Sequence, residues 1–285
     1  MSSLPLIALS PCTIIRASGT DALRFLNGQL TNELNLATEL QSIQAAALDA
    51  KGGLIAICWI RKSEDDYLID APLSLREELM DRLDRYLIAD DVTLTDESDD
   101  WKLVHLLSET ASSLSENNCI VTQANRFSCP GIDILSRERP QITGAEHLSQ
   151  EQSEALRIER GIPAWDHELT TGILPPEAGL DETAISYNKG CYLGQEIISR
   201  MKRAQKKNRH LVQLEIDSGI SPGTEFSHED TRAGVITSIT RRPDQNTDLA
   251  LGFRSRKFEA QDNFSVAGAN NDGTATVVRV VKKLA

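Results

Sequence analysis

The sequence predicts an α+β fold, and three observations support that class. Apolar strand-like runs and amphipathic helical runs follow one another irregularly, without the regular alternation of a βαβ protein. The chain has 285 residues, which at about 150 residues per domain suggests two domains or three small ones. From residue 209 onward the pattern becomes purely strand-like, which predicts a C-terminal β-barrel over 209–285 and an α+β region over 1–208.

The region 1–208 should contain short strands and four helices. The first helix opens at Gly19 and Thr20 and places Phe25, Leu26 and Leu30 on one face. Strands are expected at 12–17, 43–48, 54–61, 67–70, 92–95, 102–107 and 132–135. Further helices are expected at about 74–87, from 149 to 161, and at about 194–203.

Turns and loops connect these elements. The turn 49–53 contains Gly52 and Gly53, which can take positive φ. The segment 163–188 carries Pro175-Pro176 and few apolar repeats, and it predicts an ordered loop. Barrel strands are expected at 210–216, 234–240, 249–255 and 274–281.

Composition narrows the function classes. Thirty basic and 42 acidic residues give a formal charge of −12, which disfavours a surface that tracks nucleic acid throughout. No apolar run is long enough to cross a bilayer, and residues 1–11 lack the basic and apolar parts of a secretory signal. Five cysteines without a CxxC pair fit a reducing cytoplasm. Four of them have mainly apolar neighbours and are expected in the core: Cys12, Cys58, Cys119 and Cys129.

The segment 188–196 is the most unusual part of the sequence. It places the thiol of Cys191 between two glycines, just before a predicted helix whose free N–H groups favour a thiolate, with Lys189 nearby. Gln195 and Glu196 supply an amide and a carboxylate that suit a ring with adjacent donors and acceptors, such as a pterin. The alternative is a glycine-rich turn with a buried, inert cysteine.

The string KGCYLGQE at 189–196 resembles the K-G-C-[FY]-x-G-Q-E signature of the YgfZ family, folate-binding proteins related to the glycine-cleavage T-protein. Three other segments resemble family elements in the same order: FLNGQLTN at 25–32, RIERGIP at 157–163 and LPPE at 174–177. The resemblance implies a T-protein-like ring of two α+β parts and a C-terminal β-barrel around a central folate site.

The resemblance also implies a function. The chain would be a folate-binding accessory factor for assembly or repair of iron–sulfur clusters, especially in [4Fe–4S] enzymes that include tRNA-modifying ones. Its cofactor would be tetrahydrofolate or a derivative, with an iron–sulfur cluster bound transiently if at all. Its partners would be iron–sulfur carrier proteins and client [4Fe–4S] enzymes, with neither direct nucleic acid binding nor a membrane. Cys191 is the expected functional thiol, and whether it ligates iron is left open. The expected folate-binding residues are Lys189, Gly190, Tyr192, Gly194, Gln195, Glu196, Gln29, Asn32 and Lys51.

One departure from the T-protein pattern bears on catalysis. T-proteins that transfer an aminomethyl group have a G-G-[IV]-x-D-D element. In the matching stretch of this chain, 52–57, the two acidic positions are occupied by Ala56 and Ile57. Apolar side chains cannot position or accept a proton. The sequence therefore favours an accessory factor over the alternative, a folate-dependent aminomethyltransferase. A third interpretation, an interaction scaffold with a vestigial folate pocket, stays open.

The turn also has Gly53 where many family members have arginine, which weakens any anion contact there.

A basic run follows the signature. Six of ten residues are basic: Arg200, Lys202, Arg203, Lys206, Lys207 and Arg209. Such a run is usually a solvated face, and the alternatives are contacts with a polyglutamylated folate tail, an acidic protein or RNA phosphate. The five histidines are scattered, and neither a G-x-S-x-G elbow nor a Walker loop is present, so a mononuclear metal centre, a serine hydrolase and a P-loop enzyme are disfavoured.

Overall fold

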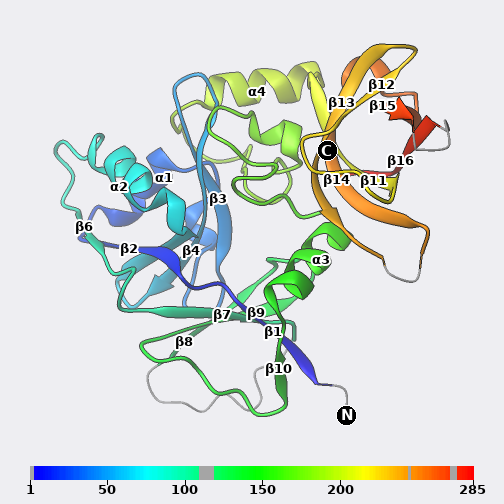
Figure 1. Cartoon of the computed structure of the whole chain (residues 1–285). Coiled ribbons are helices and arrows are strands. Elements are labelled where there is room, and N and C mark those ends of the chain that lie inside the picture. The colour runs from blue at the N-terminus through cyan, green and yellow to red at the C-terminus, as the bar shows by residue number, and fades with distance from the viewer. Residues whose placement is uncertain (1–2, 109–118, 243–244, 270–274) are drawn as a thin grey trace. The chain divides into compact units, whose positions relative to one another are not determined.

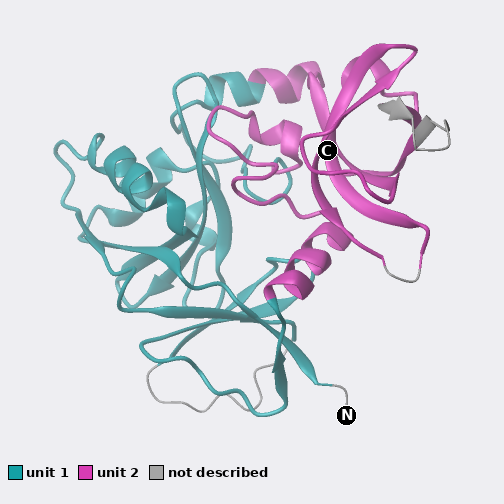
Figure 2. Cartoon of the chain, in the orientation of Figure 1, with its two compact units in different colours: residues 1–149, 181–199 teal, residues 150–180, 200–285 magenta. Residues whose placement is uncertain are grey.

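The computed structural model describes residues 3–108, 119–242, 245–269 and 275–285 (Figure 1). These residues form two compact units (Figure 2). Unit 1 consists of residues 1–149 and 181–199, and unit 2 of residues 150–180 and 200–285. The domain boundary expected between residues 208 and 209 stays a prediction.

Unit 1 is built on two five-stranded sheets. Their strand orders are β3-β4-β5-β2-β6 and β10-β1-β7-β9-β8. The strands are β1 Leu4–Ala8, β2 Cys12–Ser18, β3 Ile43–Leu48, β4 Leu54–Ser63, β5 Asp66–Pro72, β6 Thr93–Asp96, β7 Lys102–Leu106, β8 Cys119–Ala124, β9 Gly131–Ser136 and β10 Ala145–His147. A shared apolar cluster joins the two sheets, with Ile14 and Leu68 from the first packed against Leu103 and Leu135 from the second.

The described residues form four α-helices. They are α1 Ala22–Gln29, α2 Arg76–Asp84, α3 Gln150–Arg160 and α4 Gln195–Ala204. Short 3-10 turns lie at η1 Leu34–Leu36, η2 Leu73–Leu75, η3 Pro175–Ala178 and η4 Arg256–Phe258. Helix α1 buries Phe25 and Leu26, and α2 packs against β2 and β4 with Leu79 and Leu83 buried. Helix α4 continues from unit 1 into unit 2, as the change of colour in Figure 2 shows.

Unit 2 contains the predicted barrel. Six strands close in the order β11-β14-β13-β12-β15-β16. They are β11 Arg209–Asp217, β12 Glu225–His228, β13 Thr231–Thr240, β14 Thr247–Ser255, β15 Asn263–Ala269 and β16 Ala275–Lys283. Phe226, Ile236 and Phe264 are among the side chains that fill its interior. The predicted class, α+β with a C-terminal barrel, is confirmed.

Several expected elements differ in detail. The sequence pattern missed β1, β8, β10, β12 and β15, because strands of three to seven residues with mixed polarity carry little periodic signal. The helix expected at 74–87 is shorter, since Leu73–Leu75 form a separate 3-10 turn and α2 ends at Asp84.

Candidate functional site

The signature segment, defined as residues 188–196, approaches the β3–β4 turn through two glycines. Gly194 has φ +84°, and a Cβ there would lie 2.6 Å from the carbonyl oxygen of Asp49. Gly52 has φ +78°, and a Cβ there would lie 3.0 Å from the Cβ of Ile197. Only glycine permits both the backbone conformation and the contact distance. The start of α4 and the turn 49–53 are therefore in direct contact.

The turn itself is rigidly hydrogen-bonded. The Asp49 carboxylate accepts from the backbone N–H groups of Lys51 at 2.7 Å and Gly53 at 2.8 Å. These bonds form a local turn that uses the acceptor at residue 49. The Lys51 side chain is exposed, and its expected ligand contact stays a prediction.

Lys189 connects the signature segment to the end of α1. Its ammonium donates to the carbonyl oxygens of Asn27 at 2.8 Å, Leu30 at 2.8 Å and Asn32 at 2.5 Å. Burial lowers the pKa of Lys189 to about 8, and the nearby Glu33 carboxylate acts in the opposite direction. Two segments that are about 160 residues apart in the chain, 25–32 and 188–196, are thus brought together.

Side chains of the 25–32 segment hold the loop that leads into the signature. The Thr31 hydroxyl donates to the carbonyl of Ala184 at 2.6 Å, and the Asn32 amide donates to the carbonyls of Gln44 at 2.7 Å and Thr183 at 3.1 Å. The backbone N–H of Glu33 donates to the Asn32 side-chain oxygen at 2.9 Å. Asn32 therefore uses its polar atoms within the protein, and its expected role as a folate ligand stays a prediction.

Gln29 is held by an arginine that the sequence analysis did not single out. Arg82 donates to the Gln29 side-chain oxygen at 2.9 Å and to the carbonyl of Leu48 at 3.2 Å and 3.3 Å. Its side chain is buried, which lowers its pKa. A weak signal existed in the sequence, because Arg82 lies three residues after Leu79 and beside Leu83, on the apolar stripe of α2.

The cysteines differ sharply in exposure. Cys191 is exposed, whereas Cys12 and Cys58 are buried. Burial raises the pKa of the Cys12 thiol to about 11 and raises that of Cys58 as well. Cys119 and Cys129 are half-buried, so they are less buried than the core position expected for them. Among the five thiols, all in the described part of the chain, Cys191 is the most exposed.

The other signature residues fall into two groups. Tyr192 is buried, with its ring centroid 5.4 Å from the Lys189 nitrogen. Gly190 is exposed, and a Cβ added there would meet no atom within 4 Å. A Cβ added at Gly28 in α1 would also meet no atom within 4 Å. The Gly28 carbonyl accepts from the backbone N–H of Leu193 at 3.3 Å. The backbone at Gly28 and Gly190 therefore borders open space.

Gln195 and Glu196 begin α4. The Gln195 amide lies 3.5 Å from the carbonyl of Gly190, and Glu196 is exposed. A carboxylate in the first turn interacts favourably with the positive end of the helix dipole. Together with Cys191, these side chains are the chemically versatile groups of the segment.

The positions of the T-protein acidic pair lie in β4. Ala56 is 0% and Ile57 is 7% exposed, and they pair with Ala47 and Ala46 of β3. Residue 56 is fully buried, and a carboxylate there would be energetically costly unless it were paired with a cation. The structure thus has an apolar strand at this place.

The remaining two family-like segments stabilise unit 2. The Arg157 guanidinium contacts the Glu168 carboxylate at 2.8 Å and the Ser238 hydroxyl at 2.7 Å, and Glu168 is 1% exposed. Glu177, which is buried, accepts from Arg209 at 2.9 Å at the start of the barrel. One charged residue of each segment, Arg157 and Glu177, therefore forms an ion pair within this unit.

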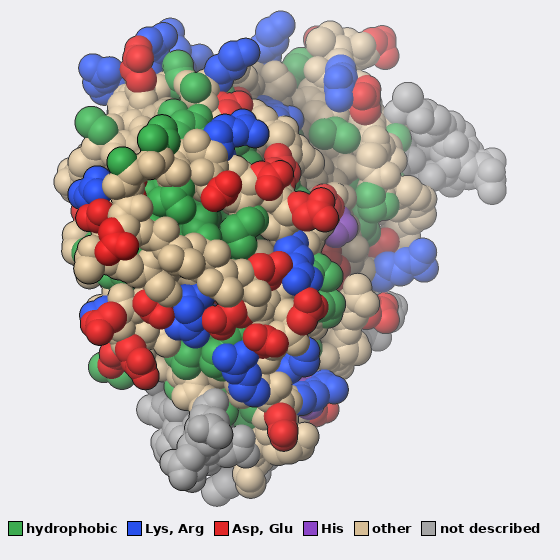
Figure 3. All heavy atoms as spheres, turned by 90° about the vertical axis from the view of Figure 1, so that its left-hand side faces the viewer, with side chains coloured by type: hydrophobic (Ala, Val, Ile, Leu, Met, Phe, Trp, Pro, Cys, Tyr) green, Lys and Arg blue, Asp and Glu red, His purple; other side chains and the backbone are tan. Residues whose placement is uncertain are grey.

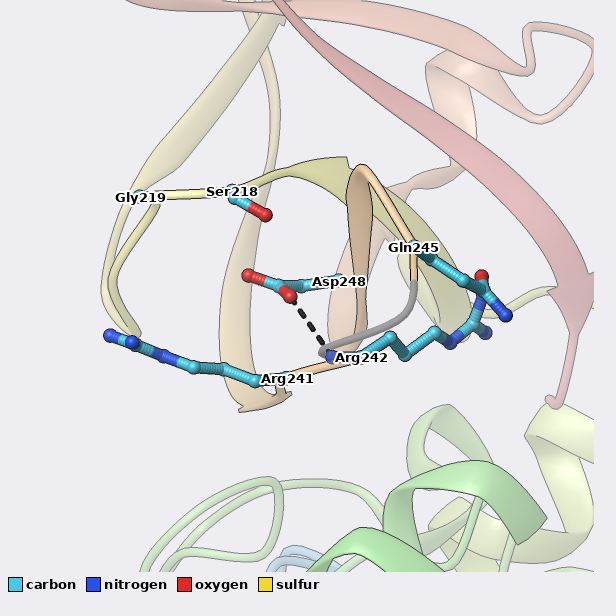
Figure 4. A pocket seen from close by; sticks show the side chains of 6 residues that line it. All are labelled: Ser218, Gly219, Arg241, Arg242, Gln245 and Asp248. Atoms are coloured by element: carbon cyan, nitrogen blue, oxygen red, sulfur yellow. Dashed lines mark hydrogen bonds between the residues drawn. The ribbon is translucent and has the colours of Figure 1, made fainter.

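Unit 2 also has a separate surface pocket of about 400 Å³ (Figure 4). Its lining residues are Ser218, Gly219, Arg241, Arg242, Gln245 and Asp248. Figure 4 shows Arg242 alongside Gln245, and the Arg242 backbone N–H donates to Asp248 at 3.2 Å. This lining supplies neither a thiol nor an aromatic ring, so we place the candidate site at the signature segment.

Across residues 3–108, 119–242, 245–269 and 275–285, no three His, Cys, Asp or Glu side chains gather closely enough to hold a metal ion. No helix in the same ranges combines the length and apolarity that a membrane span needs.

The chain is similar to known proteins in sequence and in fold. No protein-family model matches the chain. The mitochondrial iron-sulfur cluster assembly factor IBA57 homolog of Dictyostelium discoideum is 25% identical over 237 residues, which cover 68% of this chain and 58% of that protein. The tRNA-modifying protein YgfZ of Klebsiella pneumoniae is 27% identical over 234 residues, covering 74% and 71%.

A solved structure identifies the fold. The glycine cleavage system aminomethyltransferase T from Bartonella henselae superposes with a TM-score of 0.82 at 17% identity, covering 99% of this chain and 86% of that one. The expected T-protein-like fold is thereby confirmed. At this identity the likeness establishes the fold alone.

Proposed function

We propose that the chain is a member of the YgfZ family and a folate-binding accessory factor for the assembly or repair of iron–sulfur clusters, especially those of [4Fe–4S] enzymes. One observation carries this proposal: the signature segment is anchored at both ends and presents the exposed thiol of Cys191. The names of the relatives agree with it, since one is an iron-sulfur cluster assembly factor and another a tRNA-modifying protein.

The ligand we propose is tetrahydrofolate or a derivative. The backbone at Gly28 and Gly190 borders open space that a flat ring could enter. Gln195 and Glu196 offer an amide and a carboxylate, which match the adjacent donors and acceptors of a pterin. Gln29 and Asn32 would contribute less, because Arg82 and backbone groups already occupy their side-chain oxygens.

The thiol supplies the chemistry. A thiolate at Cys191 can ligate iron or attack a disulfide, and both reactions suit a factor that handles damaged clusters. Its exposure permits contact with an iron–sulfur carrier or a client enzyme, which are the partners we propose. The five free cysteines favour a reducing compartment such as the cytoplasm.

The rival function, aminomethyl transfer, leads to a direct test. We expect the purified protein to bind a reduced folate but not to replace the T-protein in a reconstituted glycine-cleavage system, because Ala56 and Ile57 cannot act on a proton. Calorimetric titration measures folate binding, and ammonia release measures aminomethyl transfer. Robust transfer activity would overturn the proposed function in favour of the enzyme.

Charge is divided unequally between the two units. Unit 1 has 13 basic and 26 acidic residues, which give a formal charge of −13. Unit 2 has 17 basic and 16 acidic residues, which give a formal charge of +1. Figure 3 shows one face of the molecule, on which acidic and basic side chains lie interspersed. We therefore propose that a role in tRNA modification is indirect, through the iron–sulfur enzymes that carry it out.

The basic run at the end of α4 provides a second test. Lys202, Arg203 and Lys206 are exposed and Lys207 is half-buried. Replacing all four with Gln should weaken binding of polyglutamylated folate more than that of monoglutamylated folate. The difference should shrink as salt rises, because exposed charges are screened over about 8–10 Å at physiological ionic strength. Equal, salt-independent losses in a titration of both ligands would indicate a structural role instead.

A further inference from the structure

The ammonium of Lys189 has three N–H donors, and the structure gives each of them a backbone carbonyl. The acceptors are the oxygens of Asn27, Leu30 and Asn32, at 2.8, 2.8 and 2.5 Å. A lysine side chain has no further donor and no acceptor. A ligand could therefore bind this ammonium only by displacing one of the three carbonyls.

The three carbonyls need this partner. Asn27 and Leu30 lie at the C-terminal end of α1, where carbonyl groups lack intrahelical N–H partners. The N–H of Thr31, which would otherwise bond to Asn27, donates to the carbonyl of Ala46 at 3.0 Å. A cation at this end also interacts favourably with the negative end of the helix dipole. Lys189 thus acts as a C-cap that comes from a distant part of the chain.

We propose that Lys189 is a positioning residue, which locks the signature segment onto the end of α1 and does not itself contact the ligand. This rests on the proposed function only in assigning folate as the ligand. Backbone hydrogen bonds to residues 25–32 lie on both sides of Lys189: just before the segment, Ser186 N–H donates to the carbonyl of Thr31 at 3.0 Å, and within it, Leu193 N–H donates to that of Gly28 at 3.3 Å. Cys191 and Gly190 lie between these anchors.

Two variants separate loss of the ammonium from loss of the side chain. In Lys189→Met the apolar stem remains and the three donors are lost. In Lys189→Ala the stem is lost too, which leaves room for a small ammonium ion beside the carbonyls. Both changes should lower hydrogen-exchange protection of the Ser186 and Leu193 amides by about tenfold or more, because the three partly buried carbonyls lose their donor. Lys102→Met, at an exposed lysine of β7, is the matched control and should leave both amides protected.

Chemical rescue identifies the role of the ammonium. Methylammonium should restore the protection in Lys189→Ala but not in Lys189→Met, whose side chain fills the space. Tetramethylammonium, with the same charge but no N–H donor, should restore neither. If methylammonium and tetramethylammonium act alike on Lys189→Ala, or if Lys189→Met keeps full protection at Ser186 and Leu193, the positioning role is wrong.

Folate titration completes the experiment. Folate binding should weaken in Lys189→Ala and recover with methylammonium in parallel with amide protection. If wild type binds no folate, the proposed function fails while the exchange measurements still test the positioning role. If Lys189→Met loses folate affinity with amide protection intact, lysine contacts the ligand and the proposal is overturned.

Discussion

A chain carrying Cys191→Ala is expected to fold normally and to fail completely when it replaces the wild type in a deletion strain. The thiol is exposed, so its removal leaves no cavity and should change stability by no more than about 0.5 kcal/mol. Its loss removes the group that would ligate iron or attack a disulfide. The measurements are the [4Fe–4S] enzyme activities of the complemented strain and the melting temperature of the purified variant.

Two further variants sharpen the interpretation. Cys191→Ser should fail as well, because a hydroxyl is a much poorer nucleophile and iron ligand at neutral pH. Cys58→Ala should show the opposite pattern, with function retained and stability lowered by about 1 kcal/mol. Cys58 is 1% exposed, and its thiol donates to the carbonyl of Ala45 at 3.4 Å.

Thiol reactivity gives an independent readout. In the folded protein Cys191 should react first with a thiol reagent, whereas Cys12 and Cys58 should react only on unfolding, since burial both shields them and raises their pKa. Full complementation by Cys191→Ala would show that the thiol has no function. The importance of the segment would then rest on Gly190, Gly194, Gln195 and Glu196.

The sequence could predict the barrel and the site segment because both depend on local chemistry. Strands β11, β13 and β14 combine apolar and β-branched residues between turn-forming residues, and their expected positions lie within the observed bounds. Glycine is the residue that tolerates positive φ and close backbone contact, so the glycines of 188–196 and of the turn 49–53 are informative in the sequence itself. For Gly52 and Gly194 the positive φ angles and the close contact explain why a pattern of glycines was informative.

The rest depends on contacts between residues that are distant in the chain. Nothing in a lysine two residues before a cysteine predicts that its ammonium will cap a helix about 160 residues earlier, as Lys189 does. Lys189 was an expected folate ligand because it belongs to the family-like signature, which is visible in the sequence, whereas unpaired carbonyls at a helix end are not.

The burial of charged residues could not be predicted from the sequence for the same reason. Arg61 of β4, Asp70 of β5 and Asp133 of β9 form an ion cluster between the two sheets of unit 1, which Arg126 and His105 complete. Arg61 and Asp133 are 0% exposed. Each residue resembles a surface charge when read alone, and burial becomes tolerable only through partners on other strands.

The second prediction with a large expected effect compares two glycines of the signature. Gly194→Ala should destabilise the protein by on the order of 3 kcal/mol, because alanine at φ +84° is strained and its Cβ would meet the Asp49 carbonyl at 2.6 Å. The turn 49–53 would have to move away from α4. We expect a lower urea midpoint and faster reaction of the buried Cys58, which lies in the adjoining strand β4.

Gly190→Ala is the matched control, since it adds the same methyl group four residues earlier. A Cβ there meets no atom within 4 Å, so the free energy of unfolding should stay within about 0.5 kcal/mol of wild type. If folate lies against the backbone beside Gly190, the methyl group should nevertheless lower folate affinity, measured by the same titration as for wild type. Unchanged affinity in a stable Gly190→Ala protein would move the ligand away from this side of the segment. A stable Gly194→Ala protein would show that the turn and α4 do not need their close contact.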